Sequence, residues 1–313
     1  MVERVAGIDH ARLQAQSLLE RFGVESIEHV YVEGFARRLE SELVASDIEG
    51  AKSQLIVGPD GATIVLPRER NWPQQRWSIA HELGHFVLRH PPLPAKEFCC
   101  PRSRRRRSDR RHWEDEANNF ASALLIPDAI VAKHCDTWPM TLYAPSQLAM
   151  QCYVPWARAA QRLMEVTWRT CAVVVSVDGV VRVIWPSLAF LALCAGRMWP
   201  EERVRGGSLA GQFFETGKPC GAPAFVPASA WLADIGRERR LIEHSEARPD
   251  ENAVITMLWD PTDSNAPRPA EATFRAMALC HEYVLGELEA NPLLKFNHAL
   301  APLVVLVSEH ASA

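Results

Sequence analysis

Apolar residues recur every three to four positions near the start of the chain, and this spacing predicts two helices. The first covers residues 9–22 (DHARLQAQSLLERF) and ends near Gly23, and the second covers residues 32–43. Two short runs rich in β-branched residues, LIVG and ATIVL, then flank Pro59-Asp60-Gly61 and predict a β-hairpin. Its second strand, residues 63–66, either pairs with an added peptide strand or lies inside a sheet, and the pattern leaves both open.

A third helix is predicted between Asn71 and His90. Asn71 is a candidate N-cap, Pro73 suits the first turn, and Pro91-Pro92 would stop the helix. Gly84 costs about 1 kcal/mol of helix propensity relative to alanine, so we expect another backbone to approach closely there. An apolar stripe would bury one side of this helix: Ile79, Leu83, Phe86 and Val87.

The run HWEDEANNFASALLIP predicts a fourth helix, which Pro127 would end. Its core-facing stripe comprises Trp113, Ala117, Phe120, Ala121 and Leu124. The linker before it, PPLPAKEFCCPRSRRRRSDRR, contains seven arginines between positions 102 and 111. We expect a solvated loop there, and the alternative is an electrostatic collar that attracts acidic groups or DNA phosphates.

The second half of the chain has a different pattern. Residues 146–164 predict two short helices broken near Pro155, a helix-turn-helix-like layout that we expect to pack rather than to read DNA. CAVVVSVDGVVRVIW predicts a hairpin around Asp178-Gly179, and AVITMLW a strand at 253–259. Helical spacing returns at 269–290. These patterns divide the chain into residues 1–130, a helical connector at 131–165, and an α+β domain at 166–313.

Composition restricts the class of protein. The chain has 313 residues, 48% of them hydrophobic and 23% charged, which is typical of a globular protein. A net charge of −4 argues against a nucleic-acid binder that uses its whole surface. The eight cysteines show no CxxC pair, the N-terminus is too charged for a signal peptide, and the longest apolar stretches are too short to span a membrane. We therefore expect a protein of the reducing cytoplasm.

The third predicted helix carries the chemistry, because its sequence contains His81-Glu82-Leu83-Gly84-His85. Residues four apart lie on one helix face, so both imidazoles can reach one ion. Glu82 would then accept a proton from metal-bound water. The other interpretation, an amphipathic helix with histidines bonded inside a core, stays open at this point.

A catalytic zinc site needs a third protein ligand, and the fourth predicted helix offers Glu114. Asn118, one turn later, could orient a ligand imidazole. Glu116 competes with Glu114 but falls about 200° around the helix, where we expect it to face water. For the group that stabilises an oxyanion, the sequence leaves four candidates open: His90, His112, Tyr143 and Tyr153.

The two motifs together, RWSIAHELGHFVLRH and EDEANNFASALLIP, resemble the ImmA/IrrE family of bacterial metallopeptidases, relatives of the zincins. The resemblance covers about residues 10–165 and implies a zincin-like α+β domain. By the family pattern, His81, His85 and Glu114 would hold Zn²⁺ or Mn²⁺ and Glu82 would be catalytic. The basic run before the fourth predicted helix departs from that pattern. For the C-terminal domain, the order and length of the predicted regions alone lead us to expect a GAF-like fold.

The resemblance implies an endopeptidase that cleaves a helix-turn-helix transcriptional repressor and so derepresses genes. Two other functions stay open. One is a metal-containing protein that binds a partner or senses a ligand without proteolysis. The other is a DNA-binding regulator that uses the arginine run and the helices of residues 146–164.

Overall fold

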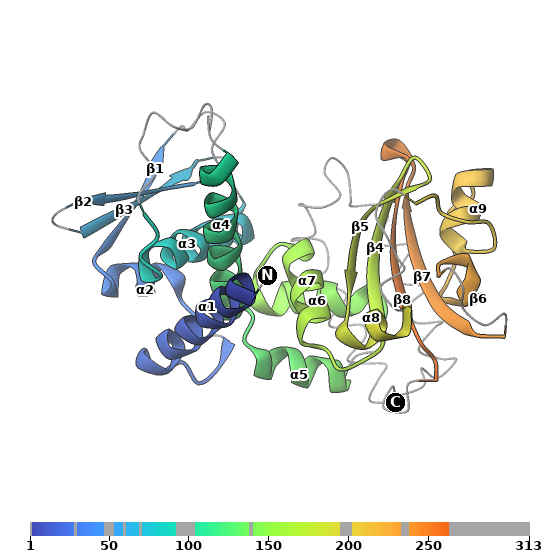
Figure 1. Ribbon diagram of the computed structural model, residues 1–313, viewed down its shortest axis with the longest axis horizontal. Helices are drawn as coiled ribbons and strands as arrows, with labels where there is room; N and C mark the ends of the chain where they lie inside the picture. The colour runs from blue at the N-terminus through green and yellow to red at the C-terminus, as the bar shows by residue number, and fades with distance from the viewer. Residues whose placement is uncertain are drawn as a thin grey trace. The chain divides into compact units, whose positions relative to one another are not determined.

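The computed structural model of the chain describes residues 2–27, 30–46, 53–58, 61–68, 71–91, 104–137, 140–194, 202–232 and 238–262. The chain divides into an N-terminal unit, Met1–Ile130 with Cys152–Val154, and a C-terminal unit, Val131–Gln151 with Pro155–Ala313. Each unit combines helices with a β-sheet, which confirms the α+β class (Figure 1). The three-part division at 130 and 165 and the GAF-like assignment stay predictions.

The N-terminal unit contains four helices and three strands among its described residues, apart from the start of α5. The helices are α1 (Val2–Arg21), α2 (Val32–Arg38), α3 (Trp72–Val87) and α4 (Arg104–Leu125), and the strands are β1 (Ser41–Ser46), β2 (Gln54–Gly58) and β3 (Gly61–Pro67). Helix α1 packs against α4, and α3 packs against both α4 and β3. The core of this unit therefore surrounds the two helices that carry the histidine and glutamate motifs.

Strand β3 lies in the middle of the sheet, whose order is β1-β3-β2. It pairs in parallel with β1 and antiparallel with β2, so the predicted hairpin is confirmed. Of the two alternatives for residues 63–66, the added-strand interpretation is wrong, because both edges of β3 are already occupied. Alternate residues of β3 are buried, namely Ala62, Ile64 and Leu66, and α3 covers the sheet.

The helix predicted over residues 32–43 is shorter than expected. It ends at Arg38, Glu40 adopts a left-handed φ of 56°, and Ser41 begins β1. Spacing of apolar residues alone cannot detect this change, because Ala36, Leu39 and Leu43 fit a helix as well as a turn into a strand. The parallel pairing of β1 with β3 supplies the hydrogen bonds that a longer helix would have made.

Helix α3 begins where the sequence predicts. The side chain of Asn71 accepts a hydrogen bond from the backbone N–H of Gln74 at 3.1 Å, and Pro73 lies in the first turn. The helix ends at Val87, three residues before the predicted stop, because Arg89 adopts a left-handed φ of 56°. Near the start of α3, the buried side chain of Arg76 donates a hydrogen bond from Nη1 to the carbonyl of Val30 at 3.0 Å. This bond ties α3 to the segment before α2.

Close approach of α4 explains Gly84. A Cβ at this position would lie 3.1 Å from both Cα and O of Ala117 and 3.2 Å from Cβ of Phe120. Ala117 and Phe120 are fully buried. The expectation that another backbone comes near Gly84 is confirmed, and the contact sets the spacing between the two motif helices.

The arginine run is not a loop from position 104 onward. Helix α4 begins at Arg104, so most of the run forms the first turns of that helix, contrary to the expectation of a solvated loop. From Ala117 onward, the apolar side chains of α4 pack in the core and stabilise the helix. Because helix formation is cooperative, the arginine-rich turns before them can be helical as well.

The C-terminal unit is built on a five-stranded antiparallel sheet of order β5-β4-β8-β7-β6. Its strands are β4 (Cys171–Val177), β5 (Val180–Pro186), β6 (Ala224–Pro227), β7 (Arg240–Arg248) and β8 (Ala253–Trp259). Short 3-10 turns, η2 (Ala228–Ala230) and η3 (Pro249–Glu251), adjoin β6 and β7. The predicted hairpin at Asp178-Gly179, with φ of 54° and 71°, and the predicted strand 253–259 are both confirmed.

Helices cover both faces of this sheet. Helices α8 (Leu188–Cys194) and α9 (Leu209–Thr216) contribute Phe190 and Phe213 to a core with Val174 and Leu258. On the opposite face, Met164 of α7 (Trp156–Val166) contacts Cys171 at 3.7 Å between sulfurs. Because both faces are covered, every residue of β8 is buried, which explains its continuous apolar sequence.

The helices α5 (Asp128–Thr137), α6 (Tyr143–Cys152) and α7 precede the sheet, and the break predicted near Pro155 is confirmed. Helix α7 packs on β4 and β5, and its buried residues include Trp156, Ala159, Ala160 and Leu163. Arg162 is only 2% exposed and pairs with Glu165 at 3.4 Å, so it is not presented for phosphate binding. The expected helices at 269–290 lie outside the described residues, and within the described part of the chain no helix is long and apolar enough to span a membrane.

Candidate metal centre

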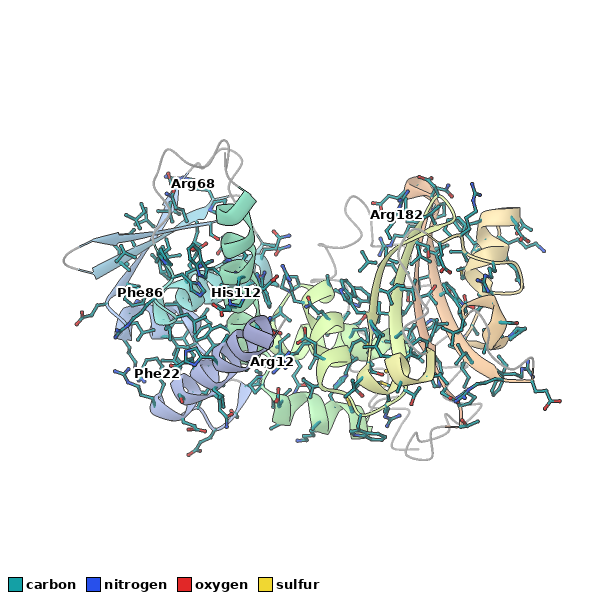
Figure 2. The ribbon with its side chains drawn as sticks, viewed as in Figure 1. Arg12, Phe22, Arg68, Phe86, His112 and Arg182 are labelled. Atoms are coloured by element: carbon teal, nitrogen blue, oxygen red, sulfur yellow. The ribbon has the colours of Figure 1, made fainter. Side chains whose placement is uncertain are left out.

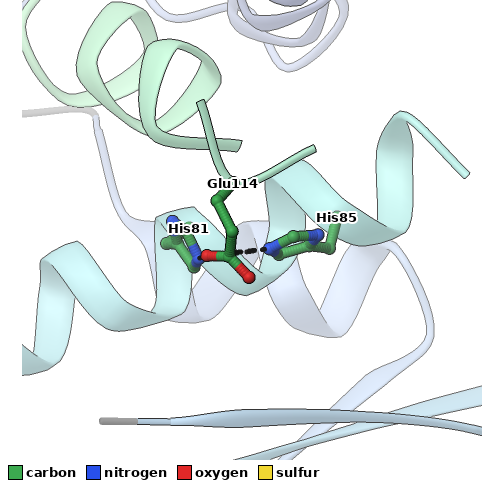
Figure 3. A group of neighbouring side chains, drawn as sticks. All are labelled: His81, His85 and Glu114. Carbon is green, nitrogen blue, oxygen red and sulfur yellow. Dashed lines mark hydrogen bonds and ion pairs between the residues drawn. The ribbon is translucent and has the colours of Figure 1, made fainter. Parts of the chain in front are cut away.

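Helix α3 presents the imidazoles of His81 and His85 one turn apart, on the side that faces α4 (Figure 3). Their Nε2 atoms lie 3.1 Å from each other. The carboxylate of Glu114, from α4, reaches between them: its Oε2 lies 3.3 Å from Nε2 of His81 and 3.9 Å from Nε2 of His85. The structure thus brings together the three side chains that the sequence singles out as ligands.

The donor set fits a zinc ion. A point equidistant from the three atoms lies about 2.0 Å from each, and zinc binds imidazole nitrogen and carboxylate oxygen at about 2.0–2.2 Å. Two neutral imidazoles cannot present bare Nε2 lone pairs to each other at 3.1 Å unless a proton or a cation lies between them. Among the described residues, this is the one group of three or more potential ligands whose donor atoms converge.

The charge of the site also suits a cation. The side chains of His81 and then His85 hold the pKa of Glu114 well below its usual range, against the opposing effect of burial. The carboxylate therefore carries a negative charge near neutral pH. It places that charge beside the two imidazole nitrogens, as in His-His-Glu zinc sites.

Glu82 is buried beside its two histidine neighbours, at 6% exposure. Ser53, just before β2, donates a hydrogen bond of 2.7 Å from Oγ to Oε1 of Glu82. This contact joins residues that are 29 positions apart, and no sequence pattern signals it. It holds one oxygen of the Glu82 carboxylate in place.

His90 returns to the site from beyond the end of α3. Its Nδ1 lies 2.9 Å from Nδ1 of His85, and its Nε2 lies 2.8 Å from Oε2 of Glu116. His112, on α4 (Figure 2), contacts the other oxygen of Glu116 at 3.0 Å through Nε2. Burial lowers the pKa of the His90 ring, which favours its neutral form.

Two expectations about α4 change as a result. The prediction that Glu116 faces water is wrong: its side chain is 14% exposed, whereas that of Glu114 is 41% exposed. The reason is that His90 and His112 enclose Glu116. Asn118 is half-buried one turn after Glu114, but no hydrogen bond joins it to either imidazole, and Nδ1 of His81 has no partner among the described residues. The role of Asn118 in orienting a ligand imidazole stays a prediction.

The candidates for oxyanion stabilisation are partly resolved. His90 uses both ring nitrogens, for His85 and Glu116, so neither is available to a substrate oxygen. Tyr143 is buried in the C-terminal unit, where its ring packs on that of His244 with 5.4 Å between ring centres. Tyr153 is 60% exposed and has a left-handed φ of 51°.

Residues 36–135 match the family described as the IrrE N-terminal-like domain, of the M78 peptidases. The matched segment contains α3 and α4 with all the residues of the candidate site. Among solved structures that are similar is a Mycobacterium tuberculosis transcriptional regulator, 13% identical, with a TM-score of 0.49, over 80% of this chain and 76% of that chain. A comparison with curated proteins gives no match. The family match therefore supports a metallopeptidase-type domain of the ImmA/IrrE kind at residues 36–135.

Proposed function

We propose that the N-terminal unit is a metal-dependent endopeptidase in which His81, His85 and Glu114 bind the ion and Glu82 is the general base. The observation that carries this proposal is the convergence of three donor atoms from α3 and α4 at 3.1, 3.3 and 3.9 Å from one another. Zn²⁺ suits such a nitrogen-and-carboxylate set, and Mn²⁺ is the alternative.

The bound ion would lower the pKa of a water molecule toward about 7 and polarise the scissile carbonyl. Glu82 would act as the general base toward a water molecule and then as the proton donor to the leaving amine. The hydrogen bond from Ser53 would hold the carboxylate for this transfer. His81, His85 and Glu114 would hold the ion as three protein ligands, the number found in catalytic zinc sites.

For the substrate, we propose a helix-turn-helix transcriptional repressor whose cleavage derepresses genes, in the cytoplasm. The match of residues 36–135 to the IrrE N-terminal-like domain supports this proposal. The C-terminal unit has its own core, centred on residues such as Val174 and Leu258, and we assign it a sensor or regulatory role. In this assignment it receives a signal and does not contribute ligands to the metal.

The test uses the full chain, freed of metal and then loaded with Zn²⁺ or Mn²⁺, and a purified helix-turn-helix repressor. The proposal predicts metal-dependent cleavage at a defined bond, detected by mass spectrometry of the fragments. The Glu82→Gln variant is the matched control and should leave the repressor intact. Binding of the repressor without cleavage by the loaded wild type would favour a non-proteolytic, metal-containing binding protein.

A DNA-binding regulator is less well supported. Arg162 of the helix-turn-helix-like segment is buried and paired within the C-terminal unit, and α7 packs on the sheet. Salt-sensitive retention of DNA that disappears when Arg104–Arg107 are neutralised would support this function instead.

A further inference from the structure

Two hydrogen bonds connect the candidate ligand His85 to a carboxylate on the other motif helix. Nδ1 of His85 meets Nδ1 of His90 at 2.9 Å, and Nε2 of His90 meets Oε2 of Glu116 at 2.8 Å. His90 and Glu116 are nearly enclosed, with 6% and 14% of their side chains exposed. The site proposed above does not assign either residue a role.

The positions of the protons follow from the chemistry of these groups. An ionised carboxylate only accepts hydrogen bonds, so Nε2 of His90 must carry the proton that points to Glu116. Nδ1 of a neutral His90 is then a bare acceptor, and Nδ1 of His85 must carry the proton between the two rings. A neutral His85 with its proton on Nδ1 presents the lone pair of Nε2 to His81 and Glu114.

The turn after α3 is what places His90 there. In a continued helix, a residue five positions after His85 would point about 140° away from it. Arg89, with φ of 56°, instead turns the chain back, and the backbone N–H of His90 donates to the carbonyl of His85 at 3.0 Å. The ring of His90 also stacks on that of Trp113, with 6.1 Å between centres.

Glu116 is fixed from a second direction. His112, one turn before it on α4, contacts Oε1 at 3.0 Å, while His90 contacts Oε2. The carboxylate therefore connects the end of α3 to the middle of α4. Those are the two helices whose spacing sets the distance between the imidazoles and Glu114.

We propose that His90 and Glu116 are positioning residues that hold His85 in the Nδ1–H tautomer and so keep its Nε2 available as a metal ligand. This inference rests on the proposed metal site. Partners of this kind, a hydrogen-bond acceptor behind a ligating histidine, change metal affinity about 10–100-fold when they are removed. Here the acceptor is an imidazole backed by a carboxylate rather than a carboxylate alone.

If His90 and Glu116 only held the two helices together, their replacement would affect folding but not the position of the proton on His85. The first measurement is therefore the tautomer of His85 in the folded, metal-free chain, read from ¹⁵N–¹H correlations of its ring nitrogens. The proposal predicts the Nδ1–H tautomer in the wild type. It predicts a shift toward Nε2–H, or a mixture, in His90→Ala.

The second measurement is the dissociation constant for Zn²⁺, obtained by competition with a chromophoric chelator. We expect about 10–100-fold weaker binding by His90→Ala and a smaller loss for Glu116→Gln. His90→Gln should recover most of the affinity, since its amide oxygen can accept the Nδ1 proton of His85. His10→Ala, which removes an exposed histidine of α1, is the matched control and should bind as the wild type does.

The outcomes separate this inference from the proposed function. A wild type in the Nε2–H tautomer, or Zn²⁺ binding by His90→Ala within about twofold of the wild type, overturns the positioning role while leaving the peptidase proposal intact. A wild type that takes up no Zn²⁺ overturns both. If His90→Ala does not fold, Glu116→Gln carries the comparison, and His90→Gln, which keeps an acceptor for His85, is its reference.

Discussion

Ser53 Oγ lies 2.7 Å from Oε1 of Glu82, and this hydrogen bond ties the entry to β2 to the centre of α3. The hydroxyl must be the donor, because an ionised carboxylate only accepts. A hydrogen bond to a charged group contributes about 1.5–3 kcal/mol, enough to fix one rotamer of a catalytic side chain. The sheet thereby determines which way the proposed base points.

Replacing Ser53 tests this relationship. Ser53→Ala should lower kcat about tenfold, because the carboxylate loses its orientation, while the metal content stays at the wild-type level. Ser53→Thr keeps the hydroxyl and should retain most of the activity. Cleavage kinetics measured alongside elemental analysis separate the two effects, and an unchanged kcat in Ser53→Ala would show that the contact has no catalytic role.

Glu82→Gln should abolish cleavage and keep the metal. The amide has nearly the same shape as the carboxylate but cannot take a proton from water, so the loss should be several orders of magnitude, at least about 10²–10⁴-fold. Single-turnover cleavage assays on the folded, metal-loaded variant measure it. Turnover close to that of the wild type would assign the base to another residue.

Gly84→Ala should push α3 and α4 apart. The added methyl group would meet the backbone of Ala117 at 3.1 Å, and overpacking of this kind costs about 1–3 kcal/mol, partly offset by about 1 kcal/mol of helix propensity. We expect a net loss of up to about 2 kcal/mol in urea denaturation and weaker binding of Zn²⁺. Gly58→Ala is the control, because its Cβ would meet only Gly61 O, at 3.7 Å. Equal stability of the two variants would contradict the close-approach explanation.

His134 of α5 gives the C-terminal unit a defined pH dependence. Burial lowers its pKa to about 4, although its Nε2–H donates to the carbonyl of Ala144 at 2.7 Å. Because the unfolded chain binds a proton near pH 6.5 and the folded chain does not, stability falls as the pH drops from about 6.5 toward 4. At pH 5 the loss is about 2 kcal/mol.

His134→Gln keeps a donor for Ala144 and removes the titration. Its free energy of unfolding should therefore depend less on pH between about 7 and 4 than that of the wild type. Denaturation curves at a series of pH values make the comparison, because the other histidines contribute equally to both proteins. Parallel pH profiles would show that His134 titrates in the folded state near its ordinary pKa.

The local part of the candidate site was predictable from the sequence. His81, Glu82 and His85 lie on one helix because of their spacing, and Asn71 caps that helix as its residue type suggests. Glu114 was predicted from a helix face and from family resemblance. The structure brings its carboxylate to the two imidazoles.

The contacts that support the site were not predictable in the same way. Ser53 reaches Glu82 only through the pairing of β2 with β3, and His90 reaches His85 only because Arg89 adopts a left-handed conformation. Glu116 seemed to face water because the helical wheel of α4 takes no account of the side chains that α3 brings to it. Long-range packing decides all three, and apolar spacing carries no information about it.

If His81, His85 and Glu114 hold one divalent ion, the metal content of the chain depends on all three side chains. The wild type and the His81→Ala and Glu114→Ala variants are loaded with Zn²⁺, dialysed and subjected to elemental analysis, with circular dichroism to verify folding. We expect one equivalent of zinc in the wild type and only a trace in each folded variant. A folded Glu114→Ala chain that keeps a full equivalent of tightly bound zinc would contradict it.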